Sequence, residues 1–246
     1  MKNRLIFILF VYILIFCGVV HSEDFNINGS NTIGLIGCWG LDETTARDDS
    51  INNSTAATSG VKATTTSVVG TALEFDGDDD YVRIGSDGEV EVITTFDVTT
   101  FTIMAWFKTD AKVAEDPIFS KMDGYTNNGY GLMWGWSGNA NKLVWVYDGG
   151  NPVVIMENAA CTIGTWYHVA ITISDNSSMT SYVNGALNTA AQAVTHTNTK
   201  FSFAIGAGYG GLEKWFDGVI DNVKFYNRVL SLAEIKDIYD EEKPSF

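Results

Sequence analysis

"WYHVAITISDNSSMTSYVNGAL", residues 166–187, contains two features that predict the architecture of the chain. From Tyr167 to Ile173 every second residue is large and apolar, and the residues between them are smaller or polar. This period of two predicts a strand packed between two layers. Asn184-Gly185 is the strongest two-residue hairpin signal, so the chain is expected to reverse there into an antiparallel neighbour.

The remainder of the chain extends this pattern. From Leu35 onward, short β-type runs are separated by clusters of Gly, Asn, Asp and Ser, with few helical patterns between them. Such spacing is typical of an all-β, antiparallel sandwich. The chain has three prolines and no charged or proline-rich linker, which favours one domain. We place that domain at residues 34–240, followed by a tail at 241–246.

Two segments depart from the strand pattern. "LSLAEIKDIYDEE" (230–242) has helical periodicity, and Ser231 and Glu234 have the spacing of a capping box. A short C-terminal helix is therefore expected to begin at about Leu232. The Thr/Asn/Ser/Ala-rich stretch 44–67 is long for a plain connection, so it is either a functional loop that wraps an edge or a mobile loop.

The N-terminus has the composition of a targeting segment. Lys2 and Arg4 precede an apolar run over residues 5–20, and a cleavage-like site of small residues follows the run. This order predicts a signal peptide at 1–22, an N-terminal segment at 23–33, and a secreted, extracellular protein. No second apolar stretch has spanning length, so the mature form is not expected to insert into a membrane. The formal net charge of −15 disfavours nucleic acid as a partner and favours cations or neutral molecules.

Six segments, in order, resemble the laminin G-like domain of the concanavalin A-like lectin/glucanase superfamily. They are "GLIGCWGLDE" (34–43), "ALEFDGDDDYVRI" (72–84), "FTIMAWFK" (101–108), "WYHVAITIS" (166–174), "SYVNGAL" (181–187) and "FDGVIDNVKFYNRVLSLAEI" (216–235). The resemblance implies a jelly-roll sandwich of two curved antiparallel sheets, one convex and one concave. It also implies that a structural calcium ion is a common companion of the fold.

The segment "GYGLMWGWSGNANKLVWVYDG" (129–149) is apolar on both faces of each of its two runs. In a jelly roll, one face of a strand packs in the core and the other can line a groove. Aromatic rings beside amides suit sugars, because a pyranose has an apolar face and a rim of hydroxyl groups. The alternative is that Trp134, Trp136 and Trp145 are core residues. The expected carbohydrate contacts are Tyr130, Trp134, Trp136, Trp145, Tyr147 and Asn127.

Hard cations bind clustered oxygen atoms, and several acidic segments offer them. In the family, the aspartate of the phrase that matches "IDNVKFY" commonly contributes to a calcium site with the N-terminal loop. The resemblance therefore points to Asp221, with Asp49 and Asn53 as loop partners and Asp217 as a further candidate. The acidic run 76–80 is equally well interpreted as a solvated turn instead of a cation site, since consecutive aspartates cannot all converge on one ion.

The sequence offers little support for catalysis. Glucanase relatives carry Glu-x-Asp-x-x-Glu on one strand, and the nearest stretch here, Glu89-Val90-Glu91, lacks the third acid. Lyases with a similar fold group arginine, glutamine, histidine and tyrosine in the groove. Here Gln192 is the single glutamine, and His168 is expected to be a hydrogen-bonded histidine of the sheet rather than a base or ligand. Whether Cys38 and Cys161 pair is left open by the sequence.

These observations predict a secreted, non-catalytic domain that recognises carbohydrate or a glycosylated surface, with a structural calcium ion. One alternative is an adhesive or scaffolding module that binds protein. A second alternative is a divergent polysaccharide-degrading enzyme, which needs two carboxylates facing each other across a groove.

Overall fold

The computed structural model describes residues 32–244, apart from the internal gaps that follow. These are 51, 55, 86–95, 111–114, 123–127, 136–141, 148–152, 196, 198–200 and 209–212, and the side chains of 153–155 and 157–160. The predicted signal peptide at 1–22 and most of the segment at 23–33 lie outside the described residues. The described part contains no helix that is long and apolar enough to cross a membrane.

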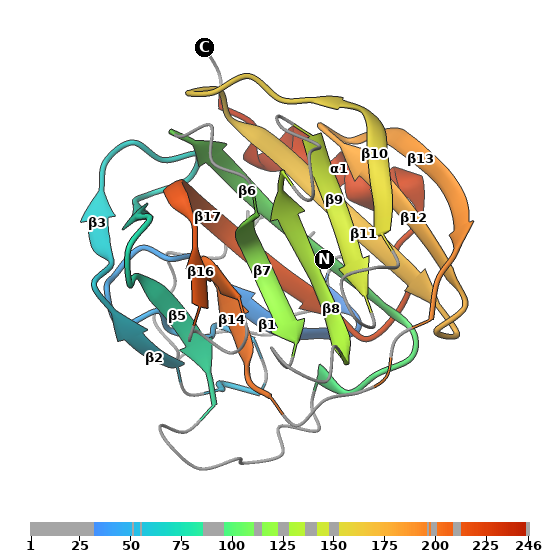
Figure 1. Ribbon diagram of the computed structural model, residues 1–246, viewed down its shortest axis with the longest axis horizontal. Coiled ribbons are helices and arrows are strands. Elements are labelled where there is room, and N and C mark those ends of the chain that lie inside the picture. The colour runs from blue at the N-terminus through green and yellow to red at the C-terminus, as the bar shows by residue number, and fades with distance from the viewer. Residues whose placement is uncertain are drawn as a thin grey trace, which may run out of the picture.

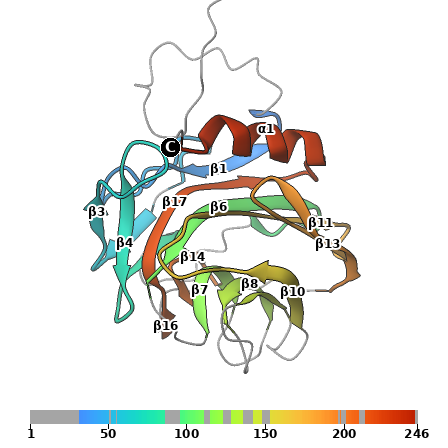
Figure 2. The same ribbon diagram turned by 90° about the horizontal axis from the view of Figure 1, so that it is seen from above.

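Two antiparallel sheets pack face to face, and one helix lies on the outer face of the first sheet (Figure 1, Figure 2). In spatial order the first sheet contains β13 (Ala186–Ala193), β12 (Ser178–Val183), β11 (Tyr167–Ser174), β6 (Phe101–Thr109), β17 (Asp217–Tyr226), β4 (Ala72–Asp76) and β3 (Lys62–Thr64), with β1 (Leu35–Trp39) also paired to β17. The jelly-roll sandwich expected from the sequence is confirmed.

The second sheet covers the inner face of the first. In spatial order it contains β10 (Val153–Ala160), β9 (Lys142–Tyr147), β8 (Gly129–Trp134), β7 (Asp116–Met122), β14 (Phe203–Ile205), β5 (Tyr81–Ile84) and β2 (Ala56–Ser59). A small hairpin of β15 (Ala207–Gly208) and β16 (Glu213–Trp215) continues from β14. Figure 2 shows the first sheet bowed over the second.

Strand β11 has the alternation that its sequence predicts. Tyr167 packs against the large core between the sheets, and Val169, Ile171 and Ile173 are fully buried within it. At Asn184 and Gly185 the chain reverses from β12 into β13, with φ angles of 51° and 72°. Asparagine and glycine tolerate this left-handed conformation, which is why the pair is a hairpin signal.

His168 lies on the opposite face of β11 and is fully buried. Its backbone N–H donates to Asn184 Oδ1 at 2.9 Å, but neither ring nitrogen has a hydrogen-bond partner among the described residues. The ring instead packs between Trp106 and Tyr239, with centroid separations of 5.2 and 5.8 Å. Burial, together with the charge of Lys224, lowers the pKa of His168 to about 3, so the ring is neutral. The expectation of a hydrogen-bonded imidazole is therefore corrected to a packed, neutral one.

Helix α1 (Leu232–Glu242) begins where the sequence predicts. The side chain of Ser231 accepts from the backbone N–H of Glu234, and the Glu234 carboxylate accepts from the backbone N–H of Ser231, so the capping box is formed. Ile235 and Ile238 pack on a second apolar cluster that covers the outer face of β6, β11, β12 and β17. The helix continues to Glu242, two residues beyond the expected end of the domain at 240.

The stretch 44–67 is not a plain loop. It contains β2 and β3, which form an edge of the second and of the first sheet respectively. Of the two alternatives from the sequence, a loop that wraps an edge and a mobile loop, the first agrees better with these edge strands. The pairing of Cys38 with Cys161 is not formed, since Cys161 is a buried free thiol.

The C-terminal turn of α1 is anchored by a buried charge. Glu242 forms an ion pair with Lys224 and accepts a hydrogen bond of 2.7 Å from the indole N–H of Trp106. We expect Glu242→Ala to lower the free energy of unfolding by about 3 kcal/mol, because it leaves the Lys224 charge buried and unpaired. Urea denaturation measures this loss. The neighbouring Glu241→Ala, at an exposed position, is the matched control and should change stability by less than about 0.5 kcal/mol. Equal effects of the two variants would contradict the role of the buried pair.

Candidate functional site

The aromatic residues of the β8–β9 hairpin face the core. Tyr130, Trp134 and Trp145 are each at most 1% exposed and belong to the cluster between the two sheets. The ring of Tyr130 stacks on Trp145 and on Phe101 of the opposite sheet, with centroids 5.4 and 5.0 Å apart. These three side chains are therefore not available to a sugar, and their predicted role as binding residues is corrected to that of core residues.

The opposite face of the same hairpin is also closed. Met133, Val144 and Val146 form a separate cluster with Met122 of β7, and all four are buried. Tyr147, at the end of β9, is half-buried and packs against the main core, and its hydroxyl donates to Ala193 O at 3.4 Å. The other two predicted contacts, Trp136 and Asn127, lie outside the described residues.

Of the predicted metal ligands, Asp221 has the most informative position. It lies in the middle of β17 and is fully buried. Its Oδ2 atom accepts hydrogen bonds from the backbone N–H groups of Val68 and Val69 at 2.8 and 3.1 Å. Oδ1 is buried without a hydrogen-bond partner among the described residues. Burial raises the pKa of Asp221 to about 7, against the lowering effect of those two hydrogen bonds.

A second carboxylate, Asp42, lies close enough for its charge to act on Asp221. Its Oδ1 accepts from the backbone N–H of Thr71 at 2.7 Å, and its Oδ2 is buried without a partner in the described part of the chain. The backbone at Gly70 packs closely against this carboxylate, because a Cβ at Gly70 would lie 2.2 Å from Asp42 Oδ1. Burial is the largest cause of the raised pKa of Asp42.

Asn222, the residue after Asp221 in β17, is a further buried polar side chain. It is 1% exposed, its backbone has a φ of 47°, and neither its amide oxygen nor its nitrogen has a partner among the described residues. Sequence analysis did not select Asp42 or Asn222. The phrase "GLDE" at 40–43 offers a signal for Asp42, but an acidic residue after a strand is common and has no metal-ligand spacing of its own.

The N-terminal loop is organised by Asp48 rather than by its predicted ligands. The Asp48 carboxylate is buried and accepts from the backbone N–H groups of Cys38, Ser50 and Ser54 at 2.8–2.9 Å. Asp49 forms an ion pair with Arg47 at 3.0 Å, and its carboxylate is also within the influence of the Asp42 charge. Asn53 is exposed. Asp49 is therefore held by Arg47, and Asn53 has no side-chain hydrogen bond with the described residues.

Asp217 does not belong to the same site as Asp221. It begins β17 and pairs in register with Asp76, whereas Asp221 pairs with Trp106. Four residues of an extended strand span about 13 Å, which is too far for one ion. The carboxylates whose charges act on Asp217 are those of Asp110, Asp76 and Glu74. Asp217, the further candidate from the sequence, is therefore too far along β17 to share an ion with Asp221.

Tyr81 and Arg83 supply an aromatic and a polar group on the outer face of the second sheet. Val82 and Ile84 of β5 point into the core, so the two alternate residues point outward. Both are half-buried, and the Arg83 guanidinium lies over the Tyr81 ring at 5.1 Å from its centroid. Sequence analysis missed this pair because "YVRI" has an ordinary strand pattern.

The two packed antiparallel sheets define the class of fold, a jelly-roll sandwich. The chain belongs to the concanavalin A-like lectin/glucanases superfamily, because the model of that family matches residues 76–236. No curated protein matches the chain by sequence.

Solved structures agree with this assignment. Domain 4 of AbnA, a GH43 extracellular arabinanase from Geobacillus stearothermophilus solved in complex with arabinotriose, is similar with a TM-score of 0.66 and 18% identity over 83% of this chain and 98% of that one. The binding domain of botulinum neurotoxin serotype D gives 0.63 and 15% over 85% of this chain. The binding domain of Paraclostridial Mosquitocidal Protein 1 gives 0.64 and 16%, also over 85%. The chain spans about half of each toxin domain, 52% in both cases.

The burial of the hairpin aromatics generates a stability prediction. We expect Trp145→Ala to lower the free energy of unfolding by about 4 kcal/mol, because it opens a large cavity in the core. Chemical denaturation monitored by circular dichroism measures the loss. Trp166→Ala removes a half-buried indole near Lys108 and should cost about 1 kcal/mol or less. A small effect of Trp145→Ala would restore it as a candidate for the surface.

Proposed function

We propose that the chain is a secreted, non-catalytic domain that binds carbohydrate. The observation that carries the proposal is the similarity to an arabinanase domain solved with arabinotriose, which covers 98% of that domain. The match extends over nearly all of the arabinanase domain, and the two similar toxin structures are also binding domains. The acidic charge of −15 agrees with a neutral glycan as the partner.

The outer face of the second sheet around β5 offers the chemistry for a sugar contact. The half-buried Tyr81 ring can pack against the apolar face of a sugar, and the Arg83 guanidinium, which already lies over that ring, offers several N–H donors. Because the guanidinium restrains the ring, part of the ordering cost of binding is met before the ligand arrives. Trp136 and Asn127 remain predicted contacts in addition to this pair.

We also propose that a calcium ion stabilises the domain at Asp221 and Asp42. Two carboxylate oxygens there are buried without partners in the described residues, and Asn222 provides an amide oxygen in the same condition. Carboxylate and amide oxygens are the ligands that calcium prefers. A divalent cation at this position offsets the cost of burying two negative charges, so the donor set fits the ion.

Binding of arabino-oligosaccharides tests the main proposal. Isothermal titration calorimetry with arabinotriose, and with neutral oligosaccharides of other sugars as comparison ligands, should detect at least one that binds with a Kd at or below about 1 mM. Tyr81→Ala should weaken that binding about tenfold, whereas Tyr81→Phe keeps the ring and should retain most of it. Absence of binding to every neutral glycan, with or without calcium, would favour the protein-binding alternative.

Thermal unfolding with calcium and with chelator tests the metal proposal. Calcium at about 100 times its Kd should raise the midpoint by about 5–10 °C, since it binds the native state. Asp42→Asn and Asp221→Asn should reduce this shift, because each removes a ligand charge. Asp237→Asn, an exposed aspartate on α1, is the charge-matched control and should preserve it. A calcium shift that is absent in the unmodified protein, or unchanged in Asp42→Asn, contradicts a calcium ion at this position.

A further inference from the structure

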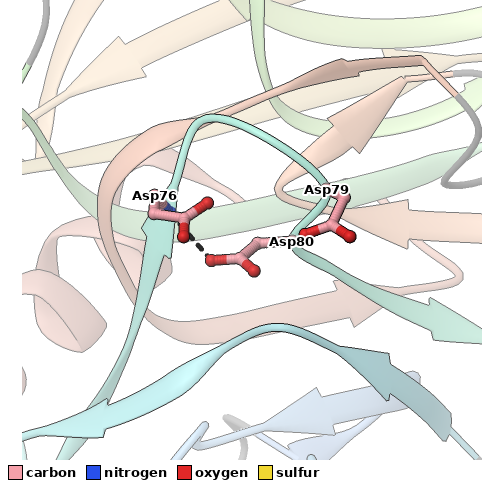
Figure 3. Close-up of side chains that lie close together, drawn as sticks. All are labelled: Asp76, Asp79 and Asp80. Atoms are coloured by element: carbon pink, nitrogen blue, oxygen red, sulfur yellow. Dashed lines mark hydrogen bonds between the residues drawn. The ribbon is translucent and has the colours of Figure 1, made fainter.

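The turn between β4 and β5 brings three carboxylates together. Asp76, Asp79 and Asp80 each offer an oxygen atom, and the three oxygens lie within 4.8 Å of one another. Figure 3 shows their side chains gathered on one side of the turn, facing the segment that links β2 and β3. From the sequence, a solvated turn was an equal alternative for this run, since consecutive aspartates cannot all converge on one ion. The turn resolves the difficulty by combining residues one, four and five of the run and leaving Asp78 out.

Asp80 is the member that points to a ligand. It is 1% exposed, and its Oδ2 accepts from the backbone N–H of Asp76 at 2.8 Å, which closes the turn. Its Oδ1 is buried and has no hydrogen-bond partner among the described residues. A buried carboxylate oxygen without a partner is costly, since it has lost its water and gained nothing in return. A cation bound by this carboxylate removes that cost.

Gly60, in the segment between β2 and β3, forms the opposite wall. Its φ is 68°, and a Cβ there would lie 1.6 Å from Asp80 Oδ1 and 3.4 Å from Asp79 Oδ1. The missing side chain therefore leaves the space that Asp80 Oδ1 occupies, with Asp79 Oδ1 at its border. Any larger residue would displace the Asp80 carboxylate from the turn.

The local charge is not balanced by the protein. No ion pair to Asp76, Asp79 or Asp80 occurs within the described part of the chain, and the one basic residue whose charge acts on Asp80 is Lys62. Lys62 belongs to β3, where it pairs in register with Glu74. Asp217, at the start of β17, adds a further negative charge beside Asp76. Hard divalent cations favour such a group of oxygens.

We propose that Asp76, Asp79 and Asp80 bind a calcium ion at the β4–β5 turn, as a second site distinct from Asp42 and Asp221. The two positions are separated along β17, because Asp76 pairs with Asp217 and Asp221 lies four residues, or about 13 Å, further on. Since β4 belongs to the first sheet and β5 to the second, this ion fastens the crossing between them. The inference goes beyond the proposed function and does not depend on it.

Calcium calorimetry on the purified chain separates the two sites. In protein that carries Asp42→Asn, the site at the turn should still bind about one calcium, with a Kd in the range of about 10⁻⁴–10⁻³ M that is usual for extracellular modules. Adding Asp79→Asn should weaken this binding at least about tenfold, because one of three ligand charges is lost. Adding Asp78→Asn instead removes the same charge from the same turn without removing a ligand, so it should weaken binding clearly less than Asp79→Asn does.

Asp79 is suited to this test, because it is exposed and makes no hydrogen bond in the described structure that its loss would break. Gly60→Ala provides an independent variant and should also weaken calcium binding, through displacement of Asp80. The single variants Asp79→Asn and Asp78→Asn in the otherwise unchanged chain give the same comparison if Asp42→Asn does not fold. Equal effects of the Asp78 and Asp79 substitutions, or the absence of any calcium uptake sensitive to Asp79, overturn the proposal. An Asp42→Asn variant that keeps the full calcium-dependent rise in the unfolding midpoint contradicts the first site and leaves the result for the turn unaffected.

Discussion

The pairing of β17 with three other strands is the constraint on which the rest of the structure depends. Its first half pairs with β4, its second half pairs with β1, and β6 runs along its other side. Because nine of its ten residues are buried, the strand has no solvent-facing side on which charge is tolerated freely. Ile220 and Phe225 face the main core, and the polar residues must find partners within the protein.

The polar residues of β17 meet this requirement in two different ways. Lys224 is paired by Glu242, so its charge is balanced by the end of α1, and the helix is thereby held on the sheet. Asp221 receives two backbone N–H groups but no positive side chain in the described part of the chain, and it lies beside another carboxylate, Asp42. Hydrogen bonds to one oxygen leave the other unpaired. The carboxylate is therefore only partly stabilised by the described residues, and this is the property on which the proposed cation site at Asp221 rests.

The sequence predicted elements whose signals are local. Alternation in β11, the turn at Asn184-Gly185 and the capping box of α1 each depend on residues close together in the chain, and each is confirmed. The orientation of the β8–β9 hairpin was harder to predict. Both of its faces are apolar, and the period of two alone does not say which face packs against the opposite sheet. Asp42 could not be selected as a site residue from the sequence. The pairing of β1 with β17, rather than sequence spacing, brings it near Asp221. The acidic turn at 76–80 depends on backbone geometry that composition does not reveal.

The two acidic sites lie at opposite ends of one strand. The segment that donates to Asp221 and Asp42, at Val68, Val69 and Thr71, leads directly into β4, and the turn at Asp76 follows it. β4 joins β17 to the short edge strand β3, which makes only three residue pairs with it. This part of the sheet therefore has fewer neighbours than the β6–β11 centre and the lower local stability that follows from them. The two cation sites that we propose therefore lie at the ends of β4, in the part of the first sheet where strand pairing contributes least.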